Sequence, residues 1–121
     1  MMNDNAKKWL EALASNKYDQ TTNILADHIN GCYCALGVAV EVYLNTVTTT
    51  SLVRRSIIGY VDTKQGDTYE ASLPPCVVEW LGIVHPVEVS KLNDYGATFE
   101  QIAQTLQENE NVFFPTQATV A

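Results

Sequence analysis

The sequence lacks long hydrophobic runs and is poor in positive charge. Its longest apolar stretch, Cys32–Val40, is far shorter than the ~20 residues that a membrane-spanning helix requires. The first residues, MMNDNAKKWL, contain no hydrophobic stretch after their lysines, so we expect no secretory signal, no membrane contact and a cytosolic location. Seven lysines and arginines stand against fourteen acidic residues, and the net charge of −7 argues against duplex nucleic acid or anionic lipid as a partner.

Cysteine and glycine are also scarce. Three cysteines cannot form a complete set of internal disulfides, which suits a reducing compartment. Cys32 and Cys34 are one residue apart, whereas zinc ligands are usually spaced by about two to four, so we favour two small buried residues over a metal site. The glycines are isolated, which excludes a phosphate-cradling loop of the Walker or dinucleotide type. We therefore predict no catalytic residues, no metal and no cofactor.

The spacing of apolar residues predicts a single α+β domain over residues 1–121. Trp9, Leu10 and Leu13 recur at helical spacing in an N-terminal helix. Thr98 and Gln101 form a capping-box pattern that starts a C-terminal helix. The predicted helices cover residues 4–15, 36–43, 76–81 and 99 to about 107. The 36–43 segment also alternates like a strand, but its alanine favours a helix.

Central antiparallel β-hairpins are predicted between these helices. The clearest has the turn Lys64-Gln65-Gly66-Asp67, and a shorter ribbon has a turn that ends in Asn30-Gly31. The strands predicted to pair are 54–62 with 67–73 and 21–25 with 31–33.

Two further segments are predicted to be irregular. Residues 84–90 are expected to form a loop or a short strand. From about residue 109 the chain is expected to be a tail, whose aromatic residues Phe113 and Phe114 would dock on a partner subunit at an oligomer interface.

Arg54 and Arg55 are the two arginines of the chain. If they lie on a strand, their side chains point to opposite faces and serve different surfaces. The planar fork of arginine binds phosphate through two parallel hydrogen bonds, which suits a cyclic nucleotide. The pair equally suits an edge strand, where charge discourages aggregation between sheets. The residues alone leave both interpretations open.

Asn93-Asp94-Tyr95-Gly96 is predicted to form a turn just before the cap of the C-terminal helix. Asparagine and aspartate tolerate the left-handed conformation, and Gly96 would close the turn. The Asn93 amide also offers donors and acceptors that match a base edge or a ribose, and the amides of the helix that follows favour phosphate. The residues alone favour the turn over a ligand clamp.

A split signature runs through most of the chain. Its first part is Trp9, Ala12, Leu13, Tyr18 and Gln20 followed by CYCALG at 32–37, and its second part is LNDYG at 92–96 followed by Phe99, Ile102 and Ala103. These blocks resemble the small bacteriophage proteins that include the first family of Thoeris anti-defence proteins. Members of that family sequester cyclic ADP-ribose isomers made by TIR enzymes, and some also bind cyclic oligonucleotides of the CBASS system. They hold the nucleotide without destroying it.

The resemblance implies a phage protein in the host cytoplasm that forms homo-oligomers. In the family, dimers can assemble into hexamers, and the ligand sites lie at protomer interfaces. By the same resemblance, Asn93 contacts the ligand beside Asp94, and the basic residues of the oligonucleotide site correspond to Arg54 and Arg55.

The chain departs from the family at one ligand-binding position. The family has an aromatic residue shortly before the asparagine, which stacks on adenine. Here the corresponding segment is Gly82-Ile83-Val84, which places Ile83 at the site without an aromatic ring. Trp80 and Tyr95 are the candidates to replace the missing ring.

We therefore expect a phage anti-defence protein that binds and sequesters host cyclic nucleotide immune signals without cleaving them. The alternative is an acidic protein-binding inhibitor of a host defence or nuclease protein, whose surface carboxylates imitate nucleic acid. An enzyme that cleaves the same signal is a third possibility, for which the sequence offers only weak signals.

Overall fold

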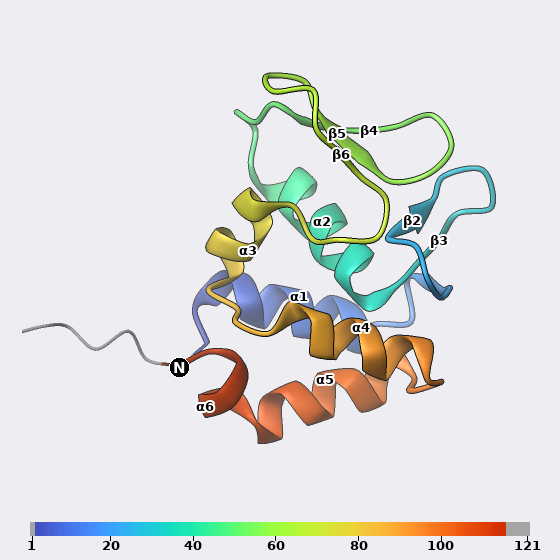
Figure 1. Cartoon of the computed structure of the whole chain (residues 1–121). Coiled ribbons are helices and arrows are strands. Elements are labelled where there is room, and N and C mark those ends of the chain that lie inside the picture. The colour runs from blue at the N-terminus through green and yellow to red at the C-terminus, as the bar shows by residue number, and fades with distance from the viewer. Residues whose placement is uncertain (1, 116–121) are drawn as a thin grey trace, which may run out of the picture.

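Helix α2 (Ala35–Thr46) is the centre of the fold. In the computed structural model, which describes residues 2–115, every residue from Ala35 to Tyr43 is buried. A helix that is buried on all sides needs cover on all sides. Figure 1 shows helices α1 (Asp4–Ala14), α3 (Pro75–Leu81) and α4 (Pro86–Asp94) around it, with a small sheet on the opposite side. Because every side of α2 is buried, its apolar residues are not confined to one helical face, and their spacing also fits the alternation of a strand.

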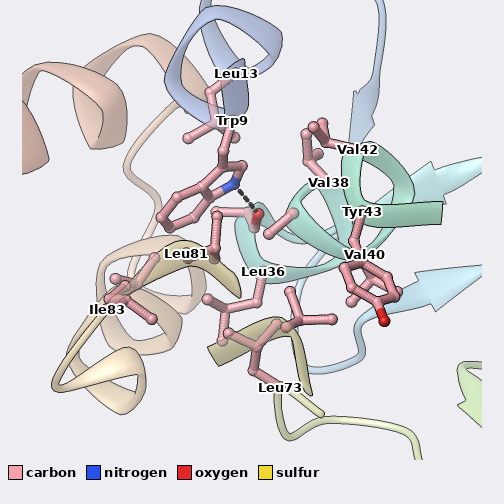
Figure 2. Packing of buried hydrophobic residues seen from close by; sticks show 14 of the residues in the cluster. Trp9, Leu13, Leu36, Val38, Val40, Val42, Tyr43, Leu73, Leu81 and Ile83 are labelled. Atoms are coloured by element: carbon pink, nitrogen blue, oxygen red, sulfur yellow. Dashed lines mark hydrogen bonds between the residues drawn. The ribbon is translucent and has the colours of Figure 1, made fainter. Parts of the chain in front are cut away.

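Helix α1 forms where the sequence predicts it. The side chain of Asn3 caps the helix by accepting a hydrogen bond from the backbone N–H of Ala6. Trp9 and Leu13 lie on its buried face, and the indole Nε1 of Trp9 donates to the carbonyl of Ala35 at 2.9 Å (Figure 2). The first helix is thus fixed to the start of the central one.

Among the described residues, six short strands form two three-stranded sheets. In the first sheet β3 lies between β1, to which it is parallel, and β2, to which it is antiparallel. The second sheet is antiparallel with the order β4-β5-β6. The strands are β1 (Asp19–Gln20), β2 (Ala26–Asp27), β3 (Cys32–Tyr33), β4 (Leu52–Arg54), β5 (Tyr60–Asp62) and β6 (Thr68–Tyr69).

The predicted fold class, a small α+β domain, is confirmed, but two strand predictions are wrong. The ribbon strand lies at Ala26–Asp27 and not at 21–25. Residues 54–62 are not one strand, because the chain turns back before Gly59, which has a left-handed φ of 72°, and β4 then pairs with β5. The hairpin between β5 and β6 forms around the predicted turn.

The prediction of a loop or strand at 84–90 is also wrong, because Pro86–Asp94 is helix α4. Pro86 occupies the first turn, where a missing N–H costs nothing, and Val89 is buried. Asn93 and Asp94 therefore end a helix, and the predicted turn follows them at Tyr95-Gly96, where the N–H of Gly96 donates to the carbonyl of Asn93 at 3.3 Å. Helix α3 ends at the predicted Gly82, and α5 (Phe99–Glu108) starts with the predicted Thr98–Gln101 capping box.

The aromatic residues after 109 are not exposed. The chain continues as helix α6 (Glu110–Phe113), and both Phe113 and Phe114 are buried in the core of the same chain. The ring of Phe114 lies edge-on to that of Trp9, with centroids 6.5 Å apart. The expectation that these rings dock on a partner is corrected accordingly, and the remainder of the expected tail, 116–121, lies outside the described residues. Within residues 2–115, no helix combines the length and apolarity needed to cross a bilayer.

Candidate functional site

The two parts of the split signature meet at the start of α2. The side-chain oxygen of Asn93 accepts hydrogen bonds from the backbone N–H of Ala35, at 3.1 Å, and from the side chain of Gln20, at 2.9 Å. Its amide nitrogen donates to the carbonyl of Thr21 at 2.8 Å. We call this set of contacts the Asn93 hub. It links α4, β1 and α2.

The Asn93 hub is buried and its amide is fully engaged. Asn93 is 1% exposed, and its second N–H points to Asp94 at 3.5 Å. Asp94 is exposed and accepts a hydrogen bond from the backbone N–H of Asn23 at 2.9 Å. A ligand could contact Asn93 only by displacing one of these bonds. The structure therefore assigns Asn93 a positioning role within its own chain.

A second polar group surrounds Glu41 in the middle of α2. Glu41 is 6% exposed and accepts two hydrogen bonds from Nε of Arg54 and one from Nη2, at 2.9 to 3.1 Å. The hydroxyl of Tyr60 donates to the same carboxylate at 2.8 Å. These contacts raise the pKa of Arg54, and burial followed by the charge of Glu41 raises the pKa of Tyr60. The guanidinium of Arg54 is thus held in one orientation while its side chain stays 45% exposed.

A row of aromatic rings leads from Tyr60 toward the surface. His28 lies edge-on between Tyr60 and Tyr33, with ring centroids 5.3 and 6.3 Å away. Tyr33 in turn meets Tyr18 edge-on at 5.6 Å. Partial burial raises the pKa of both Tyr18 and Tyr33, and the negative charge of Glu41 raises it further. Both phenols therefore lie within the electrostatic reach of the Glu41–Arg54 pair.

Arg55 lies at a different place from Arg54. It lines a hollow of about 230 Å³ together with Glu70 and the short segment Ser56-Ile57-Ile58, which we call the Arg55 hollow. Its ion pair with Glu70 is long, 3.7 Å, and both side chains are largely exposed. Such a pair contributes little to stability and is easily exchanged for another anion. Arg55 is therefore the more available of the two arginines.

The remaining predicted site residues do not join these groups. Ile83 is buried in the core (Figure 2), which corrects the expectation that it faces a ligand. Trp80 is half-buried with its ring edge-on to Tyr43, at a centroid distance of 5.4 Å. Tyr95 follows α4 and is 86% exposed, so its ring is accessible. The seven predicted residues thus fall at several places on one protomer.

A larger hollow, of about 420 Å³, lies between α1 and α5. Its charged residues are Lys7, Glu11 and Glu100, so carboxylates outnumber cations. An anionic ligand is disfavoured in such surroundings. The smaller Arg55 hollow is the better match to the expected ligand.

Cys34 has a structural role at the start of α2. Cys34 is buried and caps α2 through its sulfur, which accepts a hydrogen bond from Gly37 N–H at 3.4 Å. Burial raises the pKa of its thiol to about 11, so it is a poor thiolate ligand. Within residues 2–115, no three cysteine, histidine or acidic side chains gather as metal ligands.

Residues 1–87 match a protein family described as "Domain of unknown function (DUF8296)". The chain belongs to this family. The matched region includes Trp9, Gln20 and the CYCALG segment and ends before Asn93. No curated protein matches the chain, and no solved structure does.

In this DUF8296 chain, reasoning from sequence missed the part played by Glu41, Tyr60 and His28. Glu41 was hidden because it lies within an otherwise apolar helix, and its partner Arg54 belongs to a distant strand. Tyr18 and Tyr33 belong to the split signature together with Gln20, and this was the signal that the sequence offered for them. No pattern of neighbouring residues in the sequence indicated that the rings of Tyr18 and Tyr33 are in contact.

Proposed function

We propose that this protein binds a cyclic nucleotide immune signal and sequesters it without cleaving it, at sites shared between copies of the chain. The ligand class is cyclic ADP-ribose isomers, with cyclic oligonucleotides as the wider class. The setting is a bacteriophage protein acting in the host cytoplasm. The resemblance of the split signature supports this class, and the observation that carries the proposal is the Arg55 hollow.

The Arg55 hollow offers a cation to phosphate on a chain that is otherwise acidic. The charge of Arg54 is compensated by a close, buried carboxylate, whereas Arg55 has only a distant and exposed partner. An incoming phosphate can replace Glu70 at little cost and gain the bidentate geometry of arginine. We assign the phosphate contact to Arg55 and a positioning role to Arg54.

The size of the hollow supports a site shared between copies. At about 230 Å³ it is smaller than typical small-molecule pockets, which hold about 300 to 1,000 Å³. Effective sequestration at low signal concentration needs nanomolar binding, about −12 kcal/mol, and therefore a well-enclosed ligand. A second copy of the chain, in a dimer or in a hexamer built from dimers, would close the hollow.

Other predicted residues have supporting places in this proposal. The Asn93 hub would fix β1 and α2, which carry the residues beside the site, and Asp94 would hold the segment at Asn23. Tyr95 and Trp80 stay candidates for contacts that a second copy completes.

Isothermal titration with cyclic ADP-ribose isomers and cyclic di- and trinucleotides tests the proposal. We expect tight binding, with intact nucleotide recovered after the complex is heated. Arg55→Ala should weaken binding by about 10- to 100-fold, the loss expected for a charged hydrogen bond. Lys64→Ala, which removes an exposed cation from the β5–β6 turn, is the matched control and should bind like the natural protein. If none of these nucleotides binds, the proposal is rejected.

The rival function is inhibition of a host defence or nuclease protein. The net charge of −7 favours it, because an acidic surface can imitate nucleic acid. A pull-down from host lysate separates the two proposals: a stable protein partner supports the rival, and a protein-free oligomer with nucleotide absorbance supports capture.

A further inference from the structure

Tyr18 and Tyr33 form a pair of rings packed against the edge of the core. Both are half-buried, and they come from separate segments, the stretch before β1 and strand β3. Their rings meet at 87°, with centroids 5.6 Å apart. Neither hydroxyl hydrogen-bonds to another residue within 2–115, whereas the hydroxyls of Tyr43 and Tyr60 both do. The rings therefore combine accessible aromatic surface with two unengaged hydrogen-bonding groups.

We propose that Tyr18 and Tyr33 are a stacking platform for the purine base of the captured nucleotide, with the guanidinium of Arg54 beside it. We call this pair the tyrosine platform. The inference rests on the proposed function. It adds that the tyrosine platform recognises the purine base of the ligand. It also names the rings that replace the aromatic residue missing at Ile83.

The electrostatics of the platform favour a base over a phosphate. Glu41 neutralises Arg54, so this ion pair adds no net positive charge to the platform. An uncharged, polarisable ring is suited to such a surface, since stacking on aromatic side chains depends on the π-face and not on net charge. Arg54 keeps one nitrogen, Nη1, without a hydrogen bond to residues within 2–115, and it can face a base edge.

The protonation of the two phenols suits hydrogen bonding to the base or ribose. Burial and the nearby carboxylate of Glu41 keep the hydroxyls protonated well above neutral pH, because they raise the pKa of each phenol. A protonated phenol both donates and accepts hydrogen bonds.

The tyrosine platform and the Arg55 hollow then divide the ligand between them. Arg54 and Arg55 are sequence neighbours whose side chains lie at different places, so a ligand that contacts both would extend from one surface to the other. The base would stack on the platform, and the phosphate would reach Arg55.

Substitutions that keep or remove the ring test the platform. With cyclic ADP-ribose and cyclic tri-adenylate as probes, Tyr18→Leu and Tyr33→Leu should each weaken binding by about 5- to 150-fold, the range measured for base stacking. Tyr18→Phe and Tyr33→Phe keep the stacking surface and should stay within about fivefold of the natural protein. Tyr69→Leu is the control, since Tyr69 is also half-buried but lies on strand β6 beside Asp62 and Asp67.

A measurement on the natural protein covers the case in which a leucine variant fails to fold. With ring-labelled tyrosine, the NMR signals of Tyr18 and Tyr33 should shift on addition of either probe while those of Tyr69 do not. If the natural protein binds a probe and the leucine variants bind equally well, or the two ring signals stay fixed, the platform is rejected and nucleotide capture survives. If no probe binds the natural protein, both proposals fall.

Discussion

Asn93 and Glu41 are the buried polar and charged side chains within residues 2–115. Asn93→Ala would remove the acceptor of the buried Ala35 N–H and the donor to Thr21, leaving main-chain groups unsatisfied. We expect the free energy of unfolding to fall by about 2 to 3 kcal/mol. Urea unfolding measures this loss, and Asn45→Ala, at an exposed position of α2, should change the value by less than about 0.5 kcal/mol. Equal stability of the two variants would contradict the role given to the hub.

Because of Cys34, we expect the stability of the protein to decrease at alkaline pH. Burial raises the pKa of its thiol from 9.0 to about 11, so the folded state holds this proton more tightly than the unfolded state. The stabilising contribution is complete below about pH 9 and is lost as the pH rises toward 11. Urea unfolding across this range should therefore show a smaller decline for Cys34→Ala than for the natural protein. The slope is the readout, because the tyrosines titrate in both proteins, and parallel slopes would refute the prediction.

Helix α2 depends on a close approach that only glycine permits. A Cβ at Gly37 would collide with the carbonyl oxygen of Leu25, although alanine is the better helix former. We expect Gly37→Ala to lower the free energy of unfolding by about 3 kcal/mol. Gly31→Ala is the control: its Cβ meets nothing, and its left-handed φ of 68° should cost only about 1 kcal/mol. Thermal unfolding ranks the two variants, and the reverse order would contradict this packing.

The elements that the sequence predicted are those whose signals are local. Thr98 and Gln101 start α5 through contacts three residues apart, and Gly82 ends α3 by its own left-handed backbone. Helix α4 was missed because the Val84-His85-Pro86 segment at its start indicates a loop.

The strands and the candidate site could not be fully predicted from the sequence, and the physical reason is the same for both. The strand at Ala26–Asp27 is set by pairing with β3 and by a bridge to Ile58, which no local pattern records. The candidate site depends on contacts between distant segments, such as Arg54 with Glu41 and Tyr18 with Tyr33. The sequence could therefore name Arg54 and Arg55 but not distinguish their roles.

At the scale of the whole molecule, residues near 110 complete the core that α1 begins. Phe114 is 1% exposed and lies against Trp9, so Phe114→Ala should cost about 3 to 5 kcal/mol of stability. Val112→Ala, two residues earlier and exposed, should be almost neutral. Thermal unfolding measures both changes, and light scattering measures the oligomeric state. A Phe114→Ala protein with natural stability but an altered assembly would restore the docking role that we have corrected.

The contact between Trp9 and Phe114 has a consequence during synthesis. Trp9 leaves the ribosome early, whereas the ring that covers it is added more than a hundred residues later. Until then a nascent chain exposes one side of its largest buried side chain. The core of this domain is therefore completed only after Phe114 has emerged, and until then the growing polypeptide would present this indole to cellular chaperones.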